Sequence, residues 1–430
     1  MRDSEGAHGY RPSAGGRFTP RLMSPGVRLR AHDGPGHEGL EGTTRRRDGL
    51  WPSLDEENLL AGALLPPADA AASLARIASS EPLDEPDFPS LTIYPLLFRN
   101  LERHHQDRDL RSRLRGPYRW SWHRNQLLLA AVKPVLATLR EAGIAALTIK
   151  GLPLALDTYR DLGARVMGDA DLVVSRADAR RAAGILTEIG WRPVRPVDDR
   201  ALWALNGVDF VDGGGRRIDL QWTILPDNWD PDLDRPIWDA AEPVDLGGEL
   251  VRRPEPGDHL LLIVCHGLSW AAGTPVHWVA DAVTLLAERG EQIDWDRFIR
   301  RASFSRRALL TARGLGYLCS RFSAPVPHAV LRELQAAPID RRERAAVWLT
   351  AHSGPSAPWG RAPLVLASYA RSERTRGRRP GPRGFLTFVA TRAGCTPRRW
   401  LVLACREAAG RLRVTVAAAQ RRLVPAGVRR

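Results

Sequence analysis

Strand-forming sequence is confined to one stretch of this chain, residues 144–224, and helix-forming sequence lies on both sides of it. Within the stretch, short apolar or alternating segments are separated by turn-forming residues, and Gly213–Gly215 predicts a hairpin turn. A chain with this arrangement can build one small sheet, which helices from the flanking regions must cover. The predicted strands are Ile144–Ile149, Val166–Val174, Trp191–Val194, Val208–Asp212 and Arg217–Ile224.

Apolar residues recur at helical spacing before and after this stretch. Asn125–Ala142 predicts a helix with one apolar stripe, and Pro134 inside it predicts a kink. The expected fold class is therefore α+β, a small mixed sheet with flanking helices, embedded in mainly helical N- and C-terminal regions. The other predicted helices lie at 54–78, 95–114, 152–162, 175–189, 257–271, 277–289, 294–303, 306–321 and 327–350.

Changes in composition divide the chain into five expected regions. The first is rich in Gly, Pro, Arg and Ser without apolar periodicity, which predicts disorder. In the last, residues 353–385 are rich in Gly, Pro and Arg and predict a linker or loop. The regions are a disordered extension 1–50, a helical N-terminal region 51–125, a mixed core 126–250, a helical C-terminal domain 251–352 and an Arg-rich linker and C-terminal segment 353–430.

The net charge of +14 is concentrated at the C-terminal end. Residues 361–430 contain 17 arginines and two acidic residues, whereas the middle of the chain is not basic. A weak contact with an anionic partner, such as RNA or acidic lipid, is therefore expected through 361–430. A last helix of the folded protein is an equally good interpretation, because the segment also contains aliphatic runs such as Leu401–Ala404.

No two of the four cysteines are separated by two residues, so they do not predict a zinc knuckle. Four thiols in a chain of this length do not predict a disulfide framework either. Such sparse thiols favour a reducing compartment. No segment has the pattern of a signal peptide or is long and apolar enough to cross a bilayer. We therefore expect a cytoplasmic protein without a membrane span.

The run Gly168–Val174 carries two carboxylates on one face of a predicted central strand. Side chains two positions apart face the same way, so Asp169 and Asp171 project together. Two carboxylates this close repel each other unless a cation lies between them. Asp219, in the second strand of the predicted hairpin, can add a third carboxylate. The set predicts a site for a hard divalent ion, Mg²⁺ or Mn²⁺, although an Asp-x-Asp pair alone also fits a solvated strand end.

Two further motifs accompany the carboxylates. Lys150-Gly151 follows a predicted strand and precedes a helix, where glycine lets the backbone approach phosphate and a helix N-terminus attracts anions. Lys150 is one of only two lysines in an arginine-dominated chain. Arg165 has a guanidinium, whose geometry suits phosphate. An ordinary turn at Lys150-Gly151 and a surface role for Arg165 are the alternatives.

Together these motifs resemble the uncharacterised bacterial nucleotidyltransferase family, within the polymerase-beta-like nucleotidyltransferase superfamily. The resemblance is clearest over residues 125–224 and continues more weakly through His266 and Trp278–Asp281. Thr396–Trp400 resembles the family's C-terminal segment. The motifs that carry the resemblance are Leu147–Gly151, Tyr159–Arg165, Gly168–Val174 and Ile218–Trp222.

The resemblance implies a polymerase-beta-like core that transfers an NMP group from an NTP to an unknown acceptor, which is a small molecule, a peptide or RNA. It implies Lys150, Gly151, Arg165 and Gly168 as nucleotide-binding residues. It implies Asp169, Asp171 and Asp219 as catalytic residues and as ligands of Mg²⁺ or Mn²⁺. His266 and Asp281 are expected to line the cleft with Gln221, which stands where the family often has His.

Two other functions stay open at this point. The departure at Gln221 is compatible with a non-catalytic nucleotide- or protein-binding member of the same fold. The basic C-terminus is compatible with an RNA-binding protein. His259 and His277 lie in predicted helices near Asp258 and Asp281, but their spacings fit no zinc motif, so packing or helix-end hydrogen bonds are expected for them.

Overall fold

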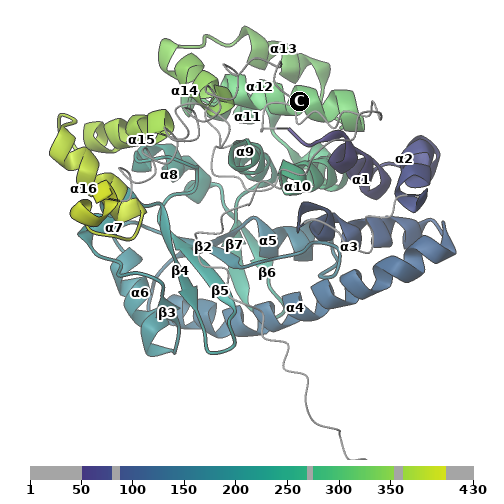
Figure 1. The fold of residues 1–430 in the computed structure, drawn as a ribbon, viewed down its shortest axis with the longest axis horizontal. Helices are drawn as coiled ribbons and strands as arrows, with labels where there is room; N and C mark the ends of the chain where they lie inside the picture. Colours follow the sequence, from purple (N-terminus) through teal and green to yellow (C-terminus); the bar gives the residue numbers. More distant parts are fainter. Residues whose placement is uncertain (1–50, 80–87, 269–274, 353–361, 403–430) are drawn as a thin grey trace, which may run out of the picture. The chain divides into compact units, whose positions relative to one another are not determined.

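A mixed seven-stranded sheet forms the centre of the structure (Figure 1). In spatial order the strands are β3 (Arg192–Pro193), β4 (Gly207–Val211), β5 (Arg217–Gln221), β2 (Ala170–Val174), β1 (Ala146–Ile149), β7 (Leu250–Arg253) and β6 (Glu242–Asp245). Two neighbouring pairs, β5 with β2 and β1 with β7, are parallel, and the other pairs are antiparallel. β2 lies between β5 and β1, as its apolar faces predicted.

The structure is a computed structural model that describes residues 51–79, 88–268, 275–352 and 362–402. All of them belong to one compact unit of the chain, residues 44–430. The predicted disordered extension 1–50 and residues 403–430 of the basic C-terminal segment lie outside the described residues. Among the residues described, no helix has the length and apolar character that a membrane span requires.

Alternation along the strands gives the sheet two apolar faces. On one face, Leu172 and Leu220 pack with α4 (Arg108–Glu141) and α6 (Ala179–Glu188). On the opposite face, Leu147 and Val173 pack with α8 (Pro231–Asp239) and α9 (Pro256–Gly267). Because Asp171 is two positions from Val173, its side chain projects from the α8/α9 face.

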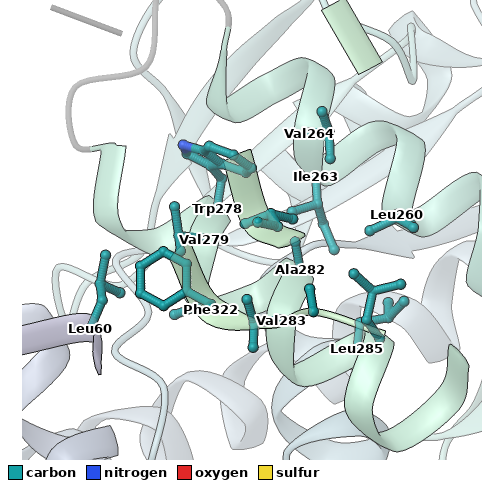
Figure 2. Packing of buried hydrophobic residues seen from close by; sticks show 14 of the residues in the cluster. Leu60, Leu260, Ile263, Val264, Trp278, Val279, Ala282, Val283, Leu285 and Phe322 are labelled. Atoms are coloured by element: carbon teal, nitrogen blue, oxygen red, sulfur yellow. The ribbon is translucent and has the colours of Figure 1, made fainter. Parts of the chain in front are cut away.

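A second apolar core lies between α9 and α10 (Pro275–Arg289), and Figure 2 shows Ile263 and Val264 of α9 near Val279 and Ala282 of α10. Leu60 and Phe322 close this core from more distant parts of the chain. The helices around it are α1 (Leu54–Leu64), α2 (Pro67–Ser79), α3 (Phe88–Arg103), α11 (Trp295–Phe304), α12 (Ala308–Phe322), α13 (His328–Ala336) and α14 (Arg341–His352).

The prediction of a linker or loop over 353–385 was wrong for its larger part, because α15 (Ala362–Thr375) and the first turn of α16 (Pro382–Arg392) lie there. Gly377, Pro380 and Gly381 separate the two helices, and Pro382 occupies the first turn of α16, where proline is tolerated. Both helices are held by an aromatic cluster in which Tyr369 and Phe388 contact Trp203 of α7 (Asp199–Ala204).

Other differences concern element boundaries. The hairpin β6–β7 was not predicted, because its strands are short and largely charged. The segments 95–114 and 125–142 were expected as separate helices, yet α4 runs unbroken from Arg108 through Pro117 and Pro134. The helix expected at 152–162 is reduced to α5 (Gly151–Pro153) and a π-helical turn, η2 (Leu154–Thr158). The domain boundaries stay predictions.

Candidate functional site

Carboxylates from three neighbouring strands lie in register on the α8/α9 face of the sheet. Asp171 of β2 is paired with Asp219 of β5, and Asp219 is paired with Asp209 of β4. Directly paired residues point to the same face of a sheet. Asp169 stands two positions before Asp171, immediately ahead of β2. The structure therefore brings the three predicted carboxylates together, while their roles stay predictions.

Asp209 was missed by the sequence analysis. Its side chain accepts a hydrogen bond from Arg217 Nη2 at 2.7 Å, so this carboxylate is already ion-paired. The hairpin register around Gly213–Gly215 was the signal that could have found it. Once Arg217 is paired with Val211, Asp209 must face Asp219.

Lys150 brings a cation to the carboxylates. Its ammonium group donates to Asp171 Oδ1 at 2.7 Å. Its backbone has a φ of 52°, which is uncommon for a residue with a side chain and stores strain. The Lys150 N–H donates to His259 Nε2 at 3.2 Å, so His259 helps to hold this conformation. The hydrogen bond predicted for His259 is thus present, and it supports the site.

Gln221 bridges two of the carboxylates. Its side-chain amide donates to Asp171 Oδ1 at 2.8 Å and to Asp219 Oδ2 at 2.7 Å. Gly207 on the neighbouring strand allows this packing, because a Cβ there would lie 2.8 Å from Asp219 Oδ1 and 2.9 Å from Gln221 Cγ. The amide and the Lys150 ammonium together supply hydrogen bonds to the carboxylates in the structure.

Arg165 lies at the other end of the same site in a bidentate ion pair. Its Nε and Nη2 donate to the two oxygens of Asp281, each at 2.8 Å. Tyr159 adds a hydrogen bond from its hydroxyl to Asp281 Oδ1 at 3.0 Å. Asn125 fixes the main chain here by donating to the Arg165 carbonyl oxygen at 2.7 Å. Arg165 is therefore oriented before any ligand is bound.

The electrostatics of the two ends differ. Burial and the neighbouring Asp171 raise the pKa of Asp169 to about 6 and that of Asp219 to about 7. Burial opposes ionisation of Asp281 as well, but the charge of Arg165 holds the pKa of that carboxyl below its usual value. Burial likewise opposes the Lys150 charge, yet Asp171 raises the Lys150 pKa overall.

A cavity of about 260 Å³ joins the two ends, and we call it the carboxylate cavity. All predicted site residues line it except Gln221, which faces an adjoining cavity. The charge of Lys150 and then burial lower the pKa of His266 to about 3, so this side chain is neutral. The predicted residues that line the carboxylate cavity are Lys150, Gly151, Arg165, Gly168, Asp169, Asp171, Asp219, His266 and Asp281.

Two further residues of this lining were not predicted. His277 was expected to serve packing or a helix end, but it and Trp278 line the carboxylate cavity. His277 Nε2 and Trp278 Nε1 are buried and have no hydrogen-bond partner among the described residues. Buried polar atoms are normally satisfied, so these two are unusual among the described residues. Only the packing of α9 against α10 brings them to the site.

Within the described residues, no group of three or more His, Cys, Asp or Glu side chains is arranged to hold a metal ion. Lys150 and Gln221 occupy the space around Asp171 Oδ1 instead. The donor chemistry nevertheless fits Mg²⁺, which usually takes one or two protein carboxylates and completes its shell with water and substrate phosphates. Metal binding by Asp169, Asp171 and Asp219 stays a prediction.

Comparison with known proteins places this mixed α+β chain in the class of nucleotidyltransferases. The chain belongs to the uncharacterised nucleotidyltransferase family, which matches residues 90–323. A solved structure with some likeness is an antigenic nucleotidyltransferase-like protein from Paracoccidioides brasiliensis, at 13% identity and a TM-score of 0.31, covering 50% of this chain and 94% of that one. No curated protein matches the chain.

Proposed function

We propose that this protein transfers an NMP group from an NTP to an acceptor, with Mg²⁺ held by Asp169, Asp171 and Asp219. The observation that carries the proposal is the meeting of these carboxylates with Lys150 at one cavity. Family membership supports the reaction class. When bound, the ion would neutralise charge on the reacting phosphate and the leaving pyrophosphate.

The donor nucleotide would lie in the carboxylate cavity. A Cβ on Gly151 would come within 3.1 Å of Arg165 Nη1 and 2.9 Å of Met167 Sδ, so glycine leaves this guanidinium nitrogen accessible to a phosphate. The ion pair with Asp281 uses the other two guanidinium nitrogens. His277 Nε2 and Trp278 Nε1 are available for further hydrogen bonds.

Lys150 donates to Asp171 in the structure and would donate to a phosphate oxygen of a bound nucleotide, so that Asp171 could hold the ion with Asp169 and Asp219. An ammonium group on a flexible stem suits this exchange. Gln221 would have to release Asp171 Oδ1 and Asp219 Oδ2 in the same step. Asp219, with a pKa of about 7 in the structure, also suits a proton acceptor for the attacking hydroxyl.

The test is calorimetric titration of the full chain with a non-hydrolysable NTP analogue, with and without Mg²⁺, together with an assay of pyrophosphate release. We expect Mg²⁺-dependent binding that Asp169→Asn weakens at least about tenfold, the loss of one charge-assisted contact. The control Asp69→Asn removes an exposed carboxylate of α2 and should bind as the original protein does. Equal binding by Asp169→Asn and the original protein would sink the proposal.

A second function is favoured by Gln221. Because its amide and the Lys150 ammonium already satisfy Asp171, the site can be stable without a metal, as in a non-catalytic nucleotide-binding protein. Tight nucleotide binding without pyrophosphate release, over a broad panel of acceptors, would favour this function. Pyrophosphate release with any acceptor would exclude it.

A further inference from the structure

A second cavity, of about 360 Å³, adjoins the carboxylate cavity, and we call it the arginine cavity after Arg195 and Arg392 in its lining. The two cavities share Lys150, Asp219 and His266. They therefore adjoin at these three residues, of which Asp219 is one of the predicted catalytic carboxylates. A two-substrate transferase needs two adjoining spaces of this kind, one for the donor and one for the acceptor.

Two arginines, Arg195 and Arg392, contribute to the lining of the arginine cavity. Arg195 Nη1 donates to the carbonyl oxygens of Thr391 and Arg392, and it forms no ion pair with a carboxylate of the described residues. Arg392 Nη1 donates to the Ala204 carbonyl oxygen at 3.1 Å. For Arg195, these carbonyl oxygens satisfy the hydrogen bonds but do not neutralise the cation.

More positive charge surrounds these two residues. Burial lowers the pKa of Arg392, Asp227 opposes this effect, and the like charge of Arg195 adds to it. Arg371 also feels Arg392 and Arg307 as like charges, with Asp227 opposing them. Asp227 is ion-paired with Arg371 at 3.4 Å. Positive charge therefore gathers at Arg195 and Arg392, whereas the carboxylates in the cavity lining are Asp209 and Asp219.

Two polar residues in the lining of this cavity carry an unsatisfied atom. Thr223 Oγ1 and Asn206 Oδ1 are buried without a hydrogen-bond partner among the described residues, and both residues line the arginine cavity. Thr223 is only 5% exposed. A buried hydroxyl with no partner is unfavourable. A ligand that carries hydroxyl groups would supply the missing partners.

We propose that the arginine cavity is the acceptor subsite and takes a hydroxyl-bearing organic anion. Arg195 and Arg392 bind its oxyanion, a phosphate or a carboxylate, and Thr223 and Asn206 bind its hydroxyl groups. The reacting hydroxyl then lies towards Asp219. The naming of this ligand as the acceptor rests on the proposed nucleotidyl transfer, whereas the binding of the anion does not.

The C-terminal helices help to build this subsite. Arg392 ends α16, which packs beside α7 (Figure 1), and the aromatic cluster around Trp203 and Phe388 fastens the two helices together. Residues 362–392 lie outside the segment that the family matches, 90–323. The chain therefore adds acceptor recognition from a region separate from the matched core.

The experiment measures binding of three small probes to the full chain: inorganic phosphate, glycerol 3-phosphate and glycerate. Line broadening of their NMR signals gives the dissociation constants, which we expect near the millimolar range for the phosphates. Arg195→Gln and Arg392→Gln should weaken the binding of all anions at least about tenfold, since each removes a charged hydrogen bond. The oxyanion that the subsite prefers, phosphate or carboxylate, is the one whose probe loses more affinity in the arginine variants.

Thr223→Val keeps the shape of the side chain but removes its hydroxyl. It should weaken glycerol 3-phosphate about threefold to tenfold and leave inorganic phosphate unchanged. The matched control for Arg392→Gln is Arg383→Gln, an exposed change on the same helix, α16. This variant should bind the probes as the original protein does. Circular dichroism of each variant checks that the fold is retained.

The proposal is overturned if the original protein binds none of the three probes, or if both arginine variants bind them as the original protein does. The NTP analogue is titrated into the same variants, and its affinity should not change. If the analogue binds no variant and not the original protein, the proposed nucleotidyl transfer fails. An arginine-dependent anion site would still stand in that case, so the two failures are distinguishable.

Discussion

The two ends of the carboxylate cavity balance their charges in opposite ways. At one end Arg165 and Asp281 form a bidentate ion pair that Tyr159 completes. At the other end three carboxylates share the ammonium group of Lys150, and two of their pKa values are raised. At the Arg165 end one cation and one carboxylate neutralise each other, whereas at the Lys150 end the carboxylates outnumber the cation.

This difference separates preorganisation from binding. A buried ion pair whose hydrogen bonds are satisfied fixes the position of Arg165 and changes little when a ligand enters. The carboxylate end is held by groups that can be exchanged, an ammonium on a flexible stem and a neutral amide. A cation and a phosphate can replace them without leaving a buried charge unpaired.

The largest effect should come from breaking the completed end. Asp281→Asn leaves Arg165 as a buried cation without its partner, which we expect to lower the free energy of unfolding by about 3–5 kcal/mol. The matched change Asp219→Asn at the other end removes a repulsive carboxylate and should cost less than about 1 kcal/mol. Urea unfolding without divalent ions compares the two, and equal losses would contradict the contrast.

A smaller effect concerns His259, which supports the strained backbone of Lys150. Burial lowers the pKa of His259 to about 3 from an ordinary value of 6.5. The folded state therefore disfavours the charged imidazole, so this contribution to stability is complete above pH 6.5 and is lost as the pH falls towards 3. His259→Gln keeps an acceptor for the Lys150 N–H but cannot titrate.

Between pH 7 and pH 5, the original protein should therefore lose about 2 kcal/mol more unfolding free energy than His259→Gln does. Urea unfolding of both proteins at the two pH values measures this difference. The other buried groups titrate in both proteins and cancel in the comparison. Parallel losses would mean that His259 does not support Lys150 as a neutral acceptor.

The smallest effect concerns Gln221, whose hydrogen bonds hold the carboxylate end of the cavity. Gln221→Ala removes the amide that bridges Asp171 and Asp219, and without metal it should cost about 1 kcal/mol of stability. Addition of Mg²⁺ should then stabilise the variant more than the original protein, because the amide no longer competes for the carboxylates. Thermal unfolding with and without Mg²⁺ tests this expectation.

The exposed change Gln335→Ala on α13 is the control for that experiment and should show the Mg²⁺ response of the original protein. Equal Mg²⁺ stabilisation of Gln221→Ala and the control would show that the amide does not compete with the ion. The carboxylate end would then be no more exchangeable than the ion pair at Arg165.

Much of the site was predictable because its signals are local. Alternation along β2 places Asp169 and Asp171 on one face, and the hairpin turn at Gly213–Gly215 sets the register that pairs Asp219 with Asp209. The parallel pairing of β5 with β2, which aligns Asp219 with Asp171, is a tertiary contact. The central position of β2 followed from its two apolar faces. The β6–β7 hairpin and helix α15 were missed because charged residues, or nearby glycines and prolines, obscure their periodicity.

The sequence by itself determined which residues are candidates for the site: a lysine, a glycine, an arginine and three aspartates in a fixed order. The tertiary structure alone decided their partners. Through it Arg165 forms an ion pair with Asp281, Gln221 bridges two carboxylates and His277 lines the carboxylate cavity. Residue types and strand alternation act over a few positions, whereas these contacts depend on how helices and strands far apart in the chain pack together.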